Sequence, residues 1–255
     1  MSEWDVASEL RGAVVRGEIL AYFQPQIDLA TGSTVGAEAL ARWNHPSRGI
    51  VEPGVFIPVA EETGLIHELG DFMLEEGCRC AASWRDLGLD IEVAVNVAAA
   101  QLETSAFFEH LDRVTSDAQL EPRLLTIEVT ESQVIADLDE VATRLGDLRD
   151  RGFGISIDDF GTGHSSVSQL VGLPATEVKI DQNLIGSPSR ASKSLMSAVV
   201  GLSKARGLRV VAEGVETAES LDHVRTLGFD RVQGFLFGRP VPRDEFEHGL
   251  LERAD

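Results

Sequence analysis

Residues 150–160, DRGFGISIDDF, carry the pattern that decides the predicted fold. A glycine follows residues typical of a helix end, and glycine suits the left-handed backbone position that closes a helix. A short apolar strand comes next and ends in two adjacent aspartates, Asp158 and Asp159. Neighbouring side chains point to opposite faces of a strand, so the two acids cannot face the same way within it. Two explanations stay open: an ordinary turn, where aspartate and glycine are common, or a divalent-cation site that offsets their repulsion.

The same pattern recurs along the chain. A glycine precedes a short apolar strand in three further segments, DLGLDIEVAVN (86–96), ARGLRVVAEG (205–214) and TLGFDRVQG (226–234). The polar residues at these strand ends are Asn96, Glu213 and Gln233. Two strands without the glycine end in the same way, LLTIEVTE at Glu128 and ATEVKID at Lys179 and Asp181. Each strand therefore presents a polar group able to bind a ligand.

Helical patterns separate these strands. Apolar residues recur at intervals of three and four at Leu138, Val141, Leu145 and Leu148, and again at Leu221, Val224 and Leu227. Residues 190–207 and 242–254 also have the composition of helices. Strands that alternate with helices indicate parallel pairing in an α/β fold.

Two earlier strands, residues 21–28 and 34–40, bring the number of predicted strands to eight. Only residues 29–33 join them, which is too short for the crossover between parallel neighbours. We therefore expect an α/β, TIM-like (β/α)8 barrel whose first strand runs antiparallel to the rest. Such a barrel places its functional residues at the carboxyl ends of the strands.

Length and composition indicate a single globular domain over residues 1–255, with 43% hydrophobic and 25% charged residues and no Pro/Ser-rich linker. The net charge of −20 argues against a polymeric nucleic acid as partner, because such binding depends on basic residues. No apolar run approaches the ~18 residues of a membrane span, and the N-terminus is too acidic for a signal peptide. Cys78 and Cys80 are spaced for neither a disulfide nor a zinc site. We expect a cytoplasmic location.

A set of oxygen-bearing side chains converges at the predicted barrel mouth: Glu38, Asn96, Glu128, Asp158, Asp159 and Glu213. Each alone has an ordinary explanation, such as a turn or a solvated surface acid. Together, five carboxylates in a confined site resist ionisation unless positive charge compensates them. All-oxygen ligation suits Mg²⁺ or Mn²⁺, and two such ions bridged by an aspartate are typical of phosphodiester hydrolysis.

These residues lie in motifs that resemble the EAL family of cyclic di-GMP phosphodiesterases. The naming triplet is Glu38-Ala39-Leu40 within EALARW. Around it stand, in the order of the family, YFQPQID, RWNHPSRGIVEPGVFIPVAEETGLI, IEVTES, IDDFGTG, KID, VAEGVE and QGFLFGRP. The resemblance covers the chain from about Leu20 to Pro242. A single EAL tripeptide would be weak evidence for the family, whereas so many motifs in the same order make a chance resemblance negligible.

The resemblance implies a metal-dependent enzyme that hydrolyses cyclic di-GMP to linear 5′-pGpG by a two-metal mechanism with a metal-bound hydroxide. It assigns the six residues above to two Mg²⁺ or Mn²⁺ ions, and makes Glu38, Asp158, Asp159 and Lys179 the catalytic set. Lys179 matches a lysine assigned as general base, although orienting the hydroxide is an alternative role. The implied substrate contacts are Gln24, Leu40, Arg42, Asp181 and Gln233. Glu131 and Glu216 match acids that order the loop after Asp159.

The chain departs from the family pattern at three places. His164 replaces a common tyrosine, NVAAAQL lacks a serine, and Leu184 replaces an aromatic residue. Relatives imply a homodimer and a sensory or cyclase domain that is either a separate partner or removed. Two other classes stay open: a domain that binds cyclic di-GMP without turnover, and a barrel glycosidase with a carboxylate pair. The glycosidase is disfavoured because aromatic residues make up only 6% of the chain.

Overall fold

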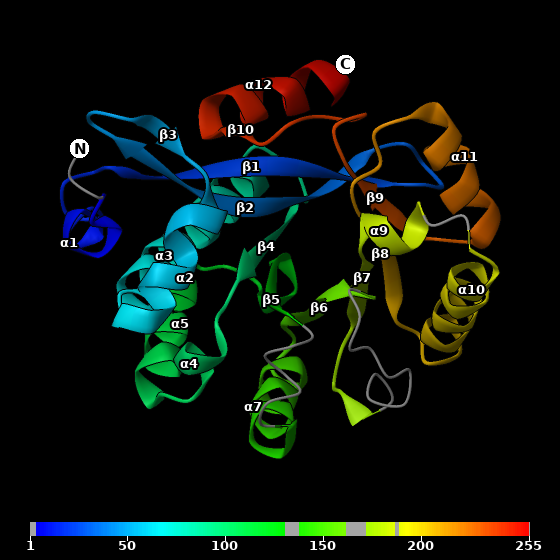
Figure 1. Ribbon diagram of the computed structural model, residues 1–255, viewed down its shortest axis with the longest axis horizontal. Coiled ribbons are helices and arrows are strands. Elements are labelled where there is room, and N and C mark those ends of the chain that lie inside the picture. Colours follow the sequence, from blue (N-terminus) through cyan, green and yellow to red (C-terminus); the bar gives the residue numbers. More distant parts are fainter. Residues whose placement is uncertain (1–3, 131–137, 162–171, 187–188, 255) are drawn as a thin grey trace.

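The computed structural model describes residues 4–130, 138–161, 172–186 and 189–254 (Figure 1). Its strands form a closed ring in the order β1-β9-β8-β7-β6-β5-β4-β2, and β2 pairs back with β1. The ring strands are β1 (Ile19–Asp28), β2 (Thr34–His45), β4 (Glu92–Asn96), β5 (Leu125–Thr130), β6 (Gly154–Phe160), β7 (Glu177–Ile180), β8 (Arg209–Ala212) and β9 (Arg231–Gln233). The predicted eight-stranded α/β barrel is therefore confirmed.

The first strand has the predicted orientation. β1 is antiparallel to both of its ring neighbours, β2 and β9, whereas every other ring pair is parallel. The short link 29–33 allows only a hairpin between β1 and β2. Two short strands that the sequence did not predict add to the ring from outside. β3 (Gly49–Val51) pairs with the end of β2, and β10 (Val241–Pro242) pairs with β1 beyond β9.

Helices surround the ring, as Figure 1 shows. The described helices are α1 (Val6–Leu10), α2 (Pro53–Thr63), α3 (Ile66–Asp86), α4 (Ala99–Leu102), α5 (Ser105–Asp117), α7 (Leu138–Asp150), α9 (Gln182–Ile185), α10 (Arg190–Ala205), α11 (Ala218–Leu227) and α12 (Arg243–Ala254), with a 3-10 turn at Pro122–Leu124. The predicted glycine stops all have positive φ: Gly88 at 80°, Gly152 at 97°, Gly207 at 71° and Gly228 at 84°. Within the described ranges, no helix has the length and apolar character needed to cross a membrane.

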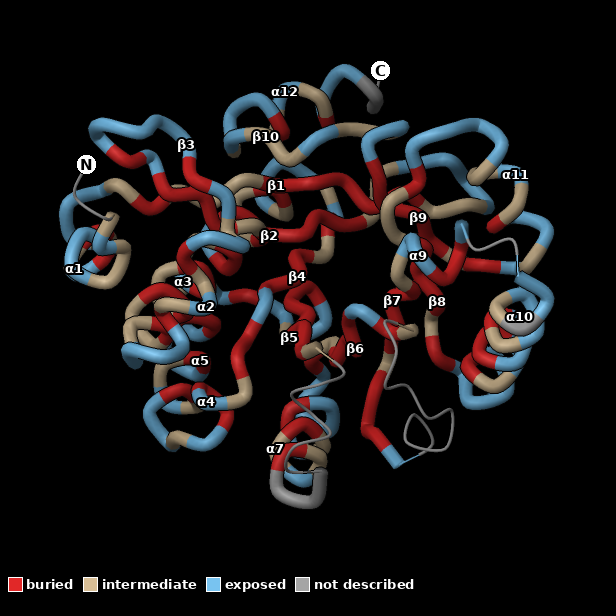
Figure 2. The backbone as a smooth tube through the Cα atoms, in the orientation of Figure 1, coloured by how far each residue is buried: buried red, intermediate tan, exposed pale blue. Residues whose placement is uncertain are grey.

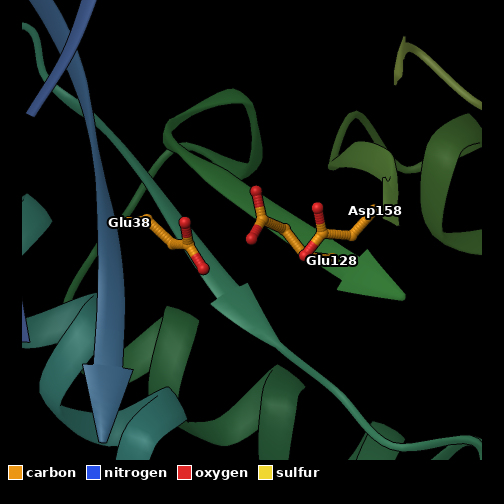
Figure 3. Close-up of side chains that lie close together, drawn as sticks. All are labelled: Glu38, Glu128 and Asp158. Atoms are coloured by element: carbon orange, nitrogen blue, oxygen red, sulfur yellow. The ribbon is translucent and has the colours of Figure 1, made fainter. Parts of the chain in front are cut away.

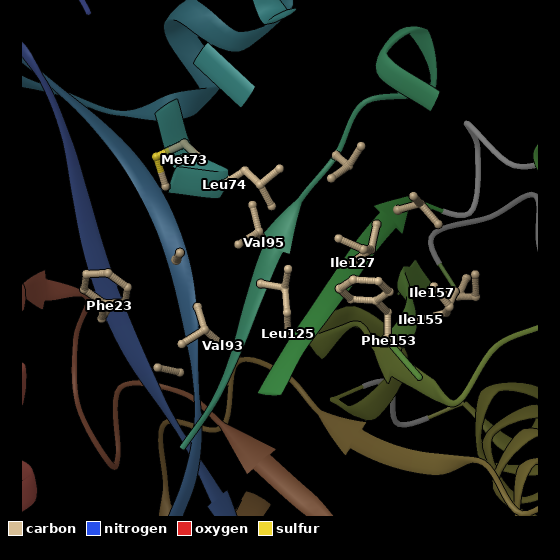
Figure 4. Close-up of a cluster of buried hydrophobic side chains, with 14 of the residues drawn as sticks. Phe23, Met73, Leu74, Val93, Val95, Leu125, Ile127, Phe153, Ile155 and Ile157 are labelled. Atoms are coloured by element: carbon tan, nitrogen blue, oxygen red, sulfur yellow. The ribbon is translucent and has the colours of Figure 1, made fainter. Parts of the chain in front are cut away.

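The strands divide their side chains between two environments. In β5 and β6, Ile127, Ile155 and Ile157 belong to the apolar cluster between ring and helices, while Glu128 and Asp158 alternate with them (Figure 4). Figure 2 shows the ring strands as the most deeply buried part of the molecule. Because alternation along a strand has a period of two, a polar barrel interior and an apolar exterior follow from the same strands.

A balanced ion-pair network closes the amino end of the barrel. Glu92, the first residue of β4, accepts bonds from Arg209 Nη2 at 2.8 Å and from Arg231 Nη2 at 2.8 Å. Arg209 also donates through Nε to Glu177 of β7 at 2.5 Å. Burial raises the pKa of Glu92, but its bonds and charge pairs with Arg231 and Arg209 outweigh burial and lower the pKa below 4.5. The network therefore joins strands β4, β7, β8 and β9.

Replacing Glu92 tests this network. Glu92→Gln should lower the free energy of unfolding by about 1.5–3 kcal/mol at neutral pH, because two guanidinium groups lose a charged acceptor. The folded-state pKa is lowered, so this stabilisation is present above pH 4.5 and is lost as pH falls through the folded value. Urea unfolding at several pH values measures it. The control Glu121→Gln removes the exposed pair with Arg123 and should change stability by less than about 1 kcal/mol; equal losses in both variants would contradict the prediction.

Candidate functional site

The expected site residues meet at the carboxyl ends of the ring strands. Glu38 lies in β2, Asn96 ends β4, Glu128 lies in β5, Asp158 and Asp159 lie in β6, Lys179 lies in β7, and Glu213 directly follows β8. Parallel register sets Asn96 level with Glu128, and Thr130 level with Asp158. Figure 3 shows the carboxylates of Glu38, Glu128 and Asp158 turned toward one another. Barrel closure thus brings together residues that are far apart in the sequence.

The ammonium of Lys179 lies at the centre of these acids. Its Nζ is 2.9 Å from Glu213 Oε1, 3.0 Å from Glu38 Oε2, 3.2 Å from Glu128 Oε2 and 3.4 Å from Asp158 Oδ1. Lys179 and Glu128 are both fully buried. A buried charge is tolerated only when it is paired and hydrogen-bonded. The lysine therefore offsets part of the repulsion among four carboxylates, three in β2, β5 and β6 and one directly after β8.

Amide side chains fix the orientation of Glu38. Asn96 Nδ2 donates to Glu38 Oε1 at 2.9 Å, and Gln233 Nε2 donates to Glu38 Oε2 at 2.6 Å. Gln233 Nε2 also donates to Gln24 Oε1 at 3.0 Å, and Gln24 in turn donates to the carbonyl of Gly238 at 3.1 Å. Gln24 and Gln233, which were expected to contact substrate, are buried and bonded to one another and to the Gly238 carbonyl and Glu38.

The adjacent aspartates face the same region because the backbone departs from the strand. Asp159 has φ of 58°, in the left-handed region that non-glycine residues rarely adopt. Strand register with β7 shifts between Ile157 and Phe160, which marks a bulge at this pair. The Asp159 N–H donates to Asp158 Oδ1 at 2.9 Å. The alternation of side chains is therefore broken at this pair, which lets both carboxylates belong to one cluster.

The acids form two overlapping groups that fit divalent cations. Oxygens of Glu38, Glu128 and Asp158 lie within 4.8 Å of one another, and so do oxygens of Asp158, Asp159 and Glu213. Asp158 belongs to both groups. The buried Oε1 of Glu128 has no hydrogen-bond donor within the described part of the chain. Carboxylate and amide oxygens with a spare buried acceptor match the ligands that hard cations prefer.

Burial and charge shift the pKa values in opposite directions across the cluster. Burial raises the pKa of Glu128 and of Glu213 well above 4.5, despite the nearby Lys179. Burial also acts on Glu38, but Lys179, Gln233 and Asn96 outweigh it and lower the pKa. Burial lowers the pKa of Lys179, but Asp158, Glu128, Glu213 and Glu38 outweigh it and raise the pKa well above 10.5. Lys179 is therefore an ammonium while these neighbours carry their charges.

A cavity of about 610 Å³ opens beside the acids. Its floor includes Glu38, Asn96, Glu128 and Asp158, and α2 and α3 supply an apolar wall. These helices contribute Ile57, Pro58, Leu69 and Met73 to the wall, and Leu40 of β2 adds to it. Apart from Leu40, sequence reasoning did not assign this wall to the site, because apolar residues in helices give the same signal whether they line a cavity or fill a core. The family motif over residues 42–66 could have pointed to Ile57 and Pro58 as wall residues, whereas Leu69 and Met73 lie outside it.

The other described residues singled out in the sequence lie outside the central cluster of acids. Arg42 is buried and pairs with Glu52 at 3.2 Å, and Asp181 accepts from the Asn183 N–H as the N-cap of α9. Glu216 is exposed and lines a separate cavity of about 480 Å³ that Glu213 also borders. Leu184 packs closely against Gly161: a Cβ added to this glycine would lie 2.7 Å from Leu184 Cδ2, too close for a real side chain. Glu131 and His164 lie outside the described residues.

The family model of the EAL domain matches residues 7–240. This chain belongs to the EAL domain family. It is 41% identical over 240 residues to the bifunctional diguanylate cyclase/cyclic di-GMP phosphodiesterase MucR of Pseudomonas aeruginosa, covering 93% of this chain and 35% of MucR. It is 39% identical over 232 residues to the cyclic di-GMP phosphodiesterase PA2567 of the same species, covering 89% of this chain and 39% of PA2567.

Solved EAL structures share the whole fold. The structure described as "PaMucR Phosphodiesterase, c-di-GMP complex" superimposes with a TM-score of 0.90 at 39% identity, covering 95% of this chain and 100% of the other. The chain spans about a third of the length of the two curated EAL relatives. The likeness therefore concerns their EAL portions.

Removing the Lys179 charge tests its structural role. Lys179→Met should lower the free energy of unfolding by about 3–5 kcal/mol at neutral pH, because four carboxylates lose their shared buried partner. The raised pKa means that the lysine's contribution is complete below pH 10.5 and is lost only as pH rises through the folded value. Urea unfolding of the metal-free protein measures it. Exposed Lys193→Met is the matched control, and equal stability of the two variants would refute the role.

Proposed function

We propose that this EAL chain is a divalent-metal-dependent phosphodiesterase that hydrolyses cyclic di-GMP to linear 5′-pGpG. The observation that carries the proposal is the cluster of five carboxylates at the barrel mouth, four of which surround one ammonium. The names of MucR and PA2567 support the substrate and reaction. Hydrolysis would add water to one phosphorus and break its bond to the 3′ oxygen, leaving a 5′ phosphate and a free 3′ hydroxyl.

The charge balance supports two cations. Five carboxylates and one ammonium carry a formal charge of −4, which two divalent ions would match. The residues that would hold them are Glu38, Asn96, Glu128, Asp158, Asp159 and Glu213, with Asp158 shared. Two bound Mg²⁺ or Mn²⁺ ions would acidify water and stabilise the charge that develops on the leaving oxygen.

Lys179 would position the carboxylates and the attacking oxygen. Lys179 would hold Glu38, Glu128 and Glu213 in place, and it would donate a hydrogen bond to the attacking oxygen while it remains protonated. To act as general base, it would first have to lose a proton that the surrounding carboxylates retain. Neutralisation of those carboxylates by cations would ease that loss.

The cavity beside α2 and α3 would receive part of the nucleotide. A volume of about 610 Å³ with apolar walls is suited to a purine base, whose faces are apolar and whose edges form hydrogen bonds. Leu40 would contact the base, and Arg42 and Asp181 lie on mouth-side segments where phosphate or base edges could reach them. A guanidinium supplies paired N–H donors that match phosphate oxygens.

The wider context of the chain is also part of the proposal. The family resemblance supports a single catalytic domain, a cytoplasmic setting, a homodimer, and regulation by a sensory or cyclase domain. Light scattering coupled to gel filtration would measure the oligomeric state. A monomer at all concentrations would contradict the dimer without affecting the catalytic proposal.

Product analysis tests the activity. Incubation of cyclic di-GMP with the chain and Mg²⁺ or Mn²⁺ should yield linear pGpG by chromatography, and EDTA should abolish it. Glu38→Ala should lose more than about a hundredfold in turnover, since ligand loss should exceed the 10–100-fold cost of disturbing a residue that only supports a ligand. The control Glu62→Gln removes an exposed acid of α2 and should keep full activity. Turnover by Glu38→Ala at the wild-type rate, or in EDTA, would refute the metal role.

Gln233 is expected to act on rate through Glu38. Gln233→Met keeps the side-chain length but removes the 2.6 Å bond to Glu38 Oε2. We expect kcat to fall about 10–100-fold, the usual effect of losing a group that orients a ligand, with little change in KM. Steady-state kinetics and a Mn²⁺ titration measure the effect. A raised KM with unchanged kcat would instead make Gln233 a substrate contact.

A further inference from the structure

Arg42 follows directly on the segment of β2 that lines the 610 Å³ cavity, and several contacts hold its side chain. It follows Leu40 and Ala41, which line that cavity, and its side chain is only 10% exposed. Its Nη1 donates to the Ala41 carbonyl at 2.9 Å, and its guanidinium lies 5.7 Å from the ring centre of Tyr22. These contacts anchor the guanidinium from the protein side. The Nε of Arg42 is paired with a carboxylate, that of Glu52.

Glu52 is an exposed and weakly held partner. Its Oε2 lies 3.2 Å from Arg42 Nε, while its side chain is 67% exposed. Glu52 occupies the N-cap position of α2, yet its side chain makes no capping bond. Pro53 and Gly54, the next two residues, line the same cavity. The ion pair therefore joins two residues whose chain neighbours line the cavity, and Glu52 is the more exposed partner of the two.

We propose that Glu52 sets the affinity of the site for anionic ligands by competing for Arg42. A phosphodiester that enters the cavity binds Arg42 by replacing the Glu52 carboxylate, which swings into water. The proposal rests on the proposed function, because it takes the nucleotide phosphate as the competing anion. Glu52 acts through Arg42 and touches no reacting atom, so it is a specificity-determining residue outside the catalytic set.

The unequal exposure of Arg42 and Glu52 determines how large a change in binding affinity we expect. Because the Glu52 carboxylate is exposed to solvent, we assign the pair the contribution of a surface ion pair, about 0.2–1 kcal/mol, which corresponds to a factor of about 1.4–5 in binding. Arg42 keeps its bond to Ala41 when the carboxylate leaves, so the guanidinium needs no rearrangement to receive phosphate. Removal of the Glu52 charge also removes a like charge near the incoming anion. Both effects act in the same direction.

Binding of cyclic di-GMP to variants tests the competition. Equilibrium dialysis in EDTA gives the dissociation constant without turnover, and KM with Mn²⁺ gives a second value. Glu52→Gln should tighten binding about 1.4- to 5-fold. Glu62→Gln removes the same charge from the far end of α2 and should leave binding unchanged. Arg42→Gln should weaken binding, and adding Glu52→Gln to it should give no gain.

Three outcomes would overturn the inference, and a fourth would contradict only the proposed function. Unchanged or weaker binding in Glu52→Gln would show that the pair is neutral or orders Arg42 for the ligand. An equal gain in Glu62→Gln, or in the Arg42→Gln background, would reveal a general charge effect. Wild-type binding without turnover would contradict the proposed function alone and leave this comparison valid. Absence of binding by either measurement would overturn both.

Discussion

The ammonium of Lys179 among four carboxylates is the interaction on which the rest of the site depends. Its four partners come from β2, β5, β6 and the residue after β8, so they meet only when the ring closes. A buried lysine cannot remain charged without such partners, and the partners cannot remain ionised at close range without it. The cluster therefore couples the closure of the barrel to the assembly of the site, while one positive charge leaves several negative charges uncompensated.

The two ends of the barrel differ in their balance of acidic and basic side chains. At the amino end, Glu92 and Glu177 meet Arg209 and Arg231, so acids and bases are equal in number. At the carboxyl end, four acids surround one lysine, Asp159 lies beside two of them, and burial raises the pKa of Glu128 and Glu213. A balanced network stabilises a fold and needs nothing more. An unbalanced one stores electrostatic repulsion that cations relieve, which is why the chemistry is expected at this end.

Amide side chains beside the acids hold Glu38 in place. Gln233 and Gln24 continue the polar interior of the barrel and fix one oxygen of Glu38, and Asn96 fixes the other. On the opposite side, α2 shapes an apolar cavity and places Glu52 against Arg42. The orientation of a ligand and the access of an anion are thus set by residues on different elements. Such a division lets affinity change at α2 without disturbing the buried cluster.

From the sequence alone we predicted the eight barrel strands, the antiparallel β1, the glycine stops and the acids at the strand ends, because these depend on local spacing and on a five-residue link. Its motifs also determined family membership. The folded structure was needed to show that oxygens of Asp158 and Asp159 lie in one cluster, since this follows from the left-handed backbone of Asp159. Likewise, barrel closure buried Gln24 and Gln233, and the hairpin of β2 with β3 placed Glu52 beside Arg42. Side-chain contacts between distant segments depend on the packing of the whole chain, which spacing along the sequence does not encode.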